Sequence, residues 1–221
     1  DSGNLAGHLL TLRPGLLALP DQKILGARLF TGLSDTLMIL VEILADTTGV
    51  VTPVGLAQLQ KHLEFAYNSP PTTLMAARSC LDQLTTSAEE VVSGINNTDR
   101  DDPAGRWARA FARQCRDALH ELTFLAPSTA LDIDEIPTLR DLAGLGNQRA
   151  IERIAAIERL ALQSIELSRM EYDFLFDKER HLLTIGYNVG ERRRDASYYD
   201  LLASEARLYS FVAIAQGQLP Q

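Results

Sequence analysis

The chain has 221 residues, of which 46% are hydrophobic and 23% are charged, and its net charge is −8. This balance is that of an ordinary globular protein and excludes wholesale disorder and a membrane-embedded chain. The acidic net charge argues against non-specific nucleic-acid binding, so no nucleic-acid partner is expected. The longest apolar run, Leu37 to Leu44, is interrupted by Glu42 and is too short to span a bilayer.

Three helices are predicted in the first part of the chain, over about residues 34–45, 52–67 and 73–94. The first is expected to start at Ser34 or Asp35, because both residue types are good N-caps. In the third, apolar residues recur every three or four positions, which indicates a helix packed along another helix.

Further helices are predicted in the middle of the chain. Asp102 followed by Pro103 is an N-cap with proline at the first helical position. A short helix follows over residues 139–143, and the longest helix of the chain is predicted over 148–172. The two cysteines and four histidines lack the spacing of metal ligands, so no metal site and no cofactor are predicted in this segment.

The pattern of apolar residues changes after residue 173. Apolar residues alternate on either side of a polar turn within residues 174–189, which predicts one small β-hairpin of 174–176 with 182–189. The last helix is predicted from Ser197, a good N-cap, to Gly217, a good C′ residue.

Glu205 lies in the centre of an apolar stripe on this last helix. The stripe is formed by Tyr198, Leu201, Leu202, Leu208, Tyr209 and Val212. Ionised carboxylates are rarely buried unless something pairs with them or uses them, so Glu205 is a candidate functional residue. The alternative is a structural ion pair with an Arg or Lys. Phe211 and Ile214 extend the apolar surface, which predicts a helix buried nearly all round.

The predicted fold class is all-α. Long helices in pairs with one small hairpin fit two architectures. One is a helical bundle or solenoid. The other is a closed barrel of inner and outer helices, in which the open ends of the inner helices carry the active site.

Four stretches resemble signatures of the bacterial cyclic β-1,2-glucan synthases. Three resemble the glycoamylase-like domain of these proteins: FLFDKERHLLTIGYNV at 174–189, SYYDLLASEAR at 197–207 and SFVAIA at 210–215. The opening DSGNLAGHL at 1–9 is similar to another signature of the same region, and the order matches the family's. Residues 34–169 resemble the family's variable intervening region, where no single residue is diagnostic.

The resemblance implies a segment of a large inner-membrane synthase. In such proteins one domain polymerises β-1,2-glucan from UDP-glucose, and the glycoamylase-like domain cyclises it by transglycosylation on an (α/α)6 barrel. Residues 1–172 would then be a helical region that leads into and forms part of the barrel, and 173–221 the start of the domain's core. Both ends of the chain look like cuts within a longer protein. The implied partners are the glucan and the other domains of the membrane-anchored parent, on the cytoplasmic side.

Transglycosylation uses two carboxyl groups, and Glu205 is predicted to be one of them, as nucleophile or acid/base. In the family, further acidic motifs lie downstream, so the second carboxylate is expected outside this chain. Arg207 either orients a carboxylate or pairs with Asp200, which shares its side of the helix.

Other residues are candidates for contacts with the sugar. Asp1, Ser2 and Asn4 are expected to offer hydrogen bonds at the mouth of the barrel, or else simply to cap a helix. Tyr198 is expected in a rim that stacks on the sugar or binds its hydroxyls, together with Tyr187, Asn188 and Tyr199, or else in packing between the hairpin and the last helix. Two other functions stay open: a β-1,2-glucan hydrolase or phosphorylase, and a non-catalytic helical interaction module.

Overall fold

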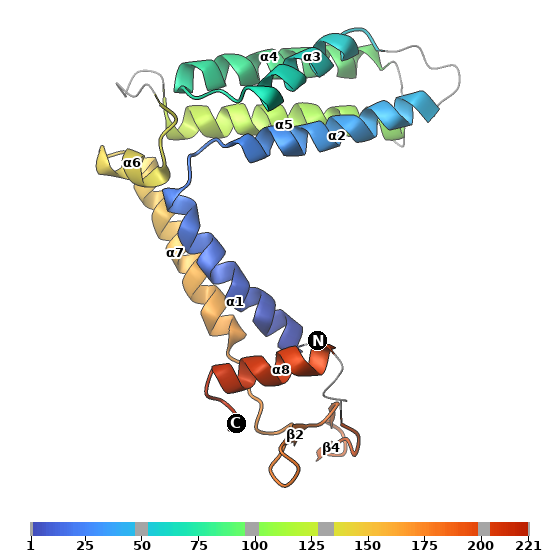
Figure 1. The fold of residues 1–221 in the computed structure, drawn as a ribbon, viewed down its shortest axis with the longest axis vertical. Coiled ribbons are helices and arrows are strands. Elements are labelled where there is room, and N and C mark those ends of the chain that lie inside the picture. The colour runs from blue at the N-terminus through green and yellow to red at the C-terminus, as the bar shows by residue number, and fades with distance from the viewer. Residues whose placement is uncertain (1, 47–52, 96–101, 128–134, 199–203, 221) are drawn as a thin grey trace. The chain divides into compact units, whose positions relative to one another are not determined.

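A computed structural model describes residues 2–46, 53–95, 102–127, 135–198 and 204–220, apart from the side chains of 2, 3 and 204–207 (Figure 1). The chain divides into two compact units. The bundle unit comprises Pro20–Ile154, and the hairpin unit comprises Asp1–Leu19 with Ala155–Gln221. The predicted division between residues 172 and 173 stays a prediction about the domains of a larger protein.

Four helices of the bundle unit enclose one apolar core. They are α2 (Ala27–Asp46), α3 (Leu56–Asn68), α4 (Leu74–Gly94) and α5 (Pro103–Leu125). Helix α2 packs on α3 and α5, and α4 packs on the same two helices, so the four close into a bundle (Figure 1). The core residues with an exposed fraction of 1% or less include Phe30, Leu33, Leu40, Leu59, Leu81, Leu84, Val91 and Phe111.

Local capping signals fix where two of these helices begin, as predicted. The hydroxyl of Thr73 accepts a hydrogen bond from the Ala76 N–H at the start of α4. The carboxylate of Asp102 accepts from the N–H groups of Ala104 and Gly105 at the start of α5. These bonds satisfy amides that have no partner inside the helix.

The predicted start of the first of these helices and the predicted longest helix are both wrong. Helix α2 begins at Ala27, and both Ser34 and Asp35 lie inside it. Phe30 and Leu33 are each 1% exposed, so burial of the preceding turns outweighs the capping preference of Ser34 and Asp35. The longest described helix is α5 with 23 residues, whereas α7 (Gln148–Ser168) has 21.

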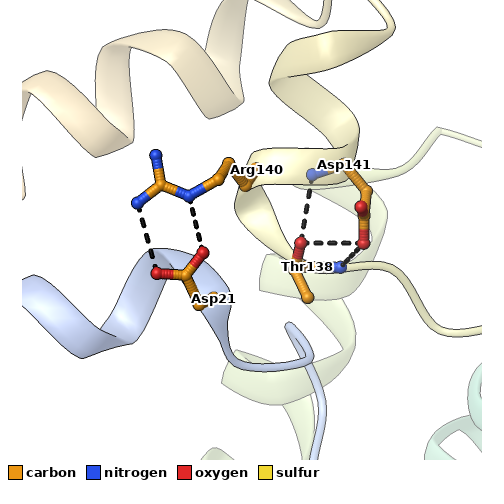
Figure 2. A network of polar contacts seen from close by, with 4 residues as sticks. All are labelled: Asp21, Thr138, Arg140 and Asp141. Carbon is orange, nitrogen blue, oxygen red and sulfur yellow. Dashed lines mark hydrogen bonds and ion pairs between the residues drawn. The ribbon is translucent and has the colours of Figure 1, made fainter.

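A polar network holds the start of the bundle unit against its later part. The guanidinium of Arg140 donates two hydrogen bonds to Asp21, which ends the short 3-10 helix η1 (Leu19–Asp21), and this lowers the pKa of Asp21 (Figure 2). Thr138 and Asp141 form a capping box that begins α6 (Leu139–Gly144), the predicted short helix. The Ile24 N–H also donates to the Pro137 carbonyl oxygen.

The hairpin unit contains two small antiparallel ladders where one was predicted. Strand β1 (Phe176–Asp177) pairs with β2 (Leu182–Leu183), and β3 (Tyr187–Asn188) pairs with β4 (Arg193–Arg194). The predicted strand over 182–189 is therefore interrupted near Gly186. A Cβ atom at Gly186 would lie 2.8 Å from Asp195 Oδ2, and the Asp195 N–H donates to the Gly186 carbonyl oxygen. The ladders are separate because residues 182–183 pair with β1, whereas residues 187–188 pair with β4.

Helices α1 (Ser2–Ala18) and α8 (Ser204–Ala215) complete the hairpin unit, with the second part of α7. Its core is formed by Tyr172, Phe176, Leu183, Ala213 and Leu219. The all-α fold class is confirmed for the described residues, whereas the (α/α)6 barrel stays a prediction. Among the described helices, none has the length and apolar character needed to cross a membrane.

The end of α8 follows the prediction and its start does not. Gly217 has φ +70°, the Gln218 N–H donates to the Ala213 carbonyl oxygen, and the Gly217 N–H donates to that of Ile214. This is the Schellman pattern expected of a C′ glycine. Ser197 is not the N-cap, because Tyr198 forms a bridge with Thr184 instead of a helical turn. Phe211 is 68% exposed, so α8 is not buried all round in this structure.

Candidate functional site

The first and last described helices, α1 and α8, pack on each other. Gly7 lies against Leu208: a Cβ atom at Gly7 would be 3.2 Å from Leu208 Cδ2. Figure 1 shows the start of α1 beside the start of α8. Asn4 lies one turn before Gly7, and Glu205 lies one turn before Leu208. The contact therefore brings the helix turns of two predicted site residues to one region of the hairpin unit.

Most of the predicted site residues have side chains outside the described part of the structure. This applies to Asp1, Ser2, Glu205 and Arg207, although the backbones of the last three belong to α1 and α8. Asn4 is described and is half-buried. The sugar-binding and catalytic roles of these residues stay predictions.

Part of the apolar stripe predicted on α8 packs inward. Helical spacing puts residue 205 in line with Tyr209, Val212 and Gln216. Val212 is 3% exposed, and the ring of Tyr209 lies 4.9 Å from that of Tyr172 between centroids. Gln216 Nε2 donates a hydrogen bond of 3.2 Å to Ser168 Oγ. Of the predicted stripe, Tyr209 and Val212 therefore pack inward, whereas Leu208 is 36% exposed and Tyr198 lies outside the helix. The burial of Glu205 stays a prediction.

Tyr198, a predicted sugar contact, is engaged by a carboxylate that sequence reasoning missed. Its hydroxyl donates a short hydrogen bond to Asp177 Oδ2, and the guanidinium of Arg180 lies 4.9 Å from the centroid of its ring. Asp177 Oδ1 accepts from the backbone N–H groups of Glu179 and Arg180, at 2.9 and 3.2 Å. The sequence could indicate the turn at Asp177, because Asp side chains often accept hydrogen bonds from amides two or three residues later. It contains no local signal for the hydrogen bond to a tyrosine 21 residues away.

The hydrogen bond between Asp177 and Tyr198 changes the pKa of both groups. The Tyr198 hydroxyl, more than any other neighbour, lowers the pKa of the Asp177 carboxyl, and Asp177 in turn raises the pKa of Tyr198. A lowered carboxyl pKa means that this interaction is present above the ordinary carboxyl pKa and is lost as the pH falls through the lowered value. The raised pKa of Tyr198 keeps its hydroxyl proton in place, so the donor is present across the neutral range.

Further aromatic side chains lie on the hairpins. The rings of Phe174 and Tyr187 meet edge to face, with centroids 5.5 Å apart, and are 48% and 36% exposed. Asn188 Oδ1 accepts a hydrogen bond from the Glu191 N–H and so stabilises the turn that follows Asn188. Tyr199 lies outside the described residues. Exposed ring faces of this kind can stack on the apolar face of a sugar.

Titratable groups do not gather into a metal site within the described ranges, where no cluster of three or more His, Cys, Asp or Glu side chains could hold an ion. The two cysteines are free and lie in the bundle unit. Burial raises the pKa of the Cys115 thiol to about 12, which keeps it protonated and unreactive at neutral pH.

The whole chain is similar to one segment of a known protein. It is 30% identical, over 239 residues, to the cyclic beta-(1,2)-glucan synthase NdvB of Rhizobium meliloti (strain 1021), and the match covers the full chain. The chain spans 8% of the length of that relative. No family model and no solved structure matches the chain.

Proposed function

We propose that this chain is a segment of the glucan-cyclising transglycosylase domain of a cyclic β-1,2-glucan synthase. The observation that carries the proposal is the similarity of the entire chain to a segment of NdvB, whose name states the synthesis of cyclic β-1,2-glucan. The α1–α8 contact supports it, because Gly7 of the family-like motif at 1–9 lies against Leu208, which directly follows the motif at 197–207.

Glu205 is proposed as one of two carboxyl groups of a retaining mechanism. In its first step, a carboxylate attacks the anomeric carbon of a β-1,2-glucan, the glycosidic bond breaks, and an acid gives its proton to the leaving oxygen. In the second step, a hydroxyl at the far end of the same chain attacks the glycosyl-enzyme, its proton passes to the base, and the carboxylate leaves. A retaining pair lies about 5–5.5 Å apart, so the partner of Glu205 must come within that distance.

The remaining predicted residues would serve binding and orientation. Asp1, Ser2 and Asn4 at the start of α1 would offer hydrogen bonds to sugar hydroxyls, and Arg207 would orient a carboxylate. Tyr198 would present a ring edge to the sugar while its hydroxyl is held by Asp177. No cofactor is needed for this chemistry. The proposed setting is the cytoplasmic side of the bacterial inner membrane, with the parent's other domains as partners.

Product analysis tests the reaction type. The full protein is incubated with linear β-1,2-glucan without UDP-glucose, and the masses of the products are measured by mass spectrometry. Intramolecular transglycosylation gives cyclic products that lack the mass of one water relative to linear chains of the same length. Linear products alone would overturn the proposal in favour of a hydrolase, and glucose 1-phosphate formed with inorganic phosphate would favour a phosphorylase.

A further inference from the structure

A pocket of about 490 Å³ lies between α3 and α4 of the bundle unit. Its residues on α3 are at positions 61, 62, 65 and 66, and those on α4 are at 76, 79, 80 and 83. This spacing places each set on one face of its helix, so the pocket follows from the way the two faces pack. The connection between the helices completes the described lining with residues 69–72. The volume is in the range of small-molecule sites, about 300–1,000 Å³.

The connection that lines the pocket is held in one conformation by its sequence and by hydrogen bonds. Its two consecutive prolines, at positions 70 and 71, have a restricted φ. The Ile136 N–H donates to the Thr72 carbonyl oxygen at 3.1 Å, and Thr73 forms a β-bridge with Glu135. The Thr73 hydroxyl also caps α4. A ligand would therefore enter a preformed pocket, without the free-energy cost of ordering this segment.

The surface that lines the pocket is mainly apolar. Phe65 is 72% exposed, so its ring is open to a ligand, and the two prolines add further apolar surface. Burial raises the pKa of the half-buried Cys80 thiol, which therefore stays protonated at neutral pH and behaves as a small apolar group. A lining of this kind favours the apolar body of a ligand over a free sugar, whose hydroxyl groups lose hydrogen bonds to water when they are buried without partners.

Lys61 gives the pocket its charge. It is the only Lys, Arg, Asp or Glu among the described residues of the lining, and it forms no ion pair with another described residue. The groove on the other side of α3, towards α2, is lined by Glu42 and Glu64 and by no Lys, Arg or His of the described ranges. His62 Nδ1 lies 3.1 Å from the buried Ser87 Oγ, which leaves Nε2 of the ring for another partner. The pocket is therefore locally cationic in a chain whose net charge is −8, and it attracts an anion.

We propose that the pocket between α3 and α4 binds an apolar monocarboxylate. The carboxylate pairs with Lys61, and the apolar body packs against Phe65 and Cys80 and displaces water from them. An aromatic acid and a short fatty acid share this chemistry. The site lies in the bundle unit and involves neither Glu205 nor the glucan, so it stands or fails independently of the proposed function.

The reaction of Cys80 with monobromobimane reports occupancy of the pocket in the full chain. Cys115, the other cysteine, is fully buried and has a pKa of about 12, so it stays unreactive. The probes are hydrocinnamate and octanoate, each compared with its uncharged amide. When an acid is tenfold above its Kd, about one-tenth of the pockets are free, and the reaction should become about tenfold slower. The amides should bind at least about tenfold more weakly. Protection by one acid alone supports the proposal and identifies the ligand as aromatic or aliphatic.

Two variants and a matched control locate the site. Lys61→Met should raise the Kd of the acids about tenfold, because the charged donor is lost while the apolar stem is kept. Lys178→Met, the same change on an exposed lysine of the hairpin unit, should leave the Kd within about twofold of wild type. Ala76→Phe fills the pocket from an exposed position on α4, so the acids should no longer slow the reaction of Cys80. Urea titration followed at Trp107 checks that each variant is folded.

The proposal is overturned if neither acid protects Cys80 at concentrations up to about 10 mM, which detect even millimolar affinity. Equal protection by the acids and their amides would also overturn it, because the pocket would then have no preference for an anion. An effect of Lys61→Met no larger than that of Lys178→Met would remove the cation from the site. Protection that persists in folded Ala76→Phe would place the acid elsewhere on the chain.

Discussion

Glu205→Gln should reduce the rate of cyclic glucan formation by about 10²- to 10⁴-fold, the range contributed by one acid, base or nucleophile. Glutamine keeps the size of the side chain and removes both its charge and its titratable proton. If Glu205 is one of the two reacting carboxyl groups, kcat falls and the KM for linear glucan changes little. The measurement is the initial rate of cyclic product formation by the full protein from linear β-1,2-glucan.

The matched control is Glu42→Gln. Glu42 also interrupts an apolar run, but it is exposed on α2 in the bundle unit. Its variant should keep the wild-type rate within about twofold, as expected of an exposed substitution away from the chemistry. Cyclisation at the normal rate by Glu205→Gln would remove this residue from the mechanism. An equal loss in both variants would indicate a general effect on folding instead.

Phe111→Ala should destabilise the bundle unit by about 3–5 kcal/mol, the usual effect of emptying a buried phenylalanine site. Phe111 is fully buried on α5, among the core residues that α2 and α4 contribute. Trp107 is the only tryptophan of the chain and lies partly buried on the same helix, so its fluorescence reports unfolding of this unit specifically. The free energy of unfolding is obtained from urea titrations followed at the tryptophan emission.

Phe65→Ala supplies the comparison for this stability measurement. Phe65 is on α3 of the same unit and is 72% exposed, so removing its ring leaves no cavity. Its free energy of unfolding should stay within about 0.5 kcal/mol of wild type. Equal destabilisation by the two variants would mean that α2 to α5 do not enclose the core described here.

Local chemistry made several elements predictable. Thr73 and Asp102 cap α4 and α5 because each side chain reaches amides only two or three residues away. Gly217 ends α8 for a similar reason, since the left-handed backbone of the Schellman motif suits glycine. The apolar stripe of α8 could also be predicted in part, because it depends only on helical spacing.

The wrong predictions involve interactions between distant segments. The start of α2 depends on the burial of Phe30 and Leu33 by other helices, which no local cap reveals. The hairpin divides in two because residues 182–183 pair with β1 and residues 187–188 pair with β4, a consequence of register and not of alternation. Phe211 remains exposed although it extends an apolar pattern.

In the candidate site, too, local features could be predicted from the sequence and contacts between distant segments could not. Glu205 is predicted from the sequence alone, because a carboxylate within an apolar stripe is visible in the residues, and its role stays a prediction. Asp177 could not be predicted from the sequence, because its hydrogen bond to Tyr198 depends on two pairings between separate segments. Strand β1 must pair with β2, and Tyr198 must form its bridge with Thr184. The contact of Gly7 with Leu208 joins opposite ends of the chain and has no local signal.

A glucan site at the starts of α1 and α8 is tested most directly by titrating the isotope-labelled chain with linear β-1,2-gluco-oligosaccharides. β-1,4-linked oligosaccharides of the same length serve as the control. We predict that the NMR shifts of Asn4, Gly7 and Leu208 change in a saturable way with the β-1,2-linked sugar alone, and that those of the bundle unit do not. Absence of binding, equal binding of both sugars, or shifts centred on α2 to α5 would contradict a glucan site at this contact.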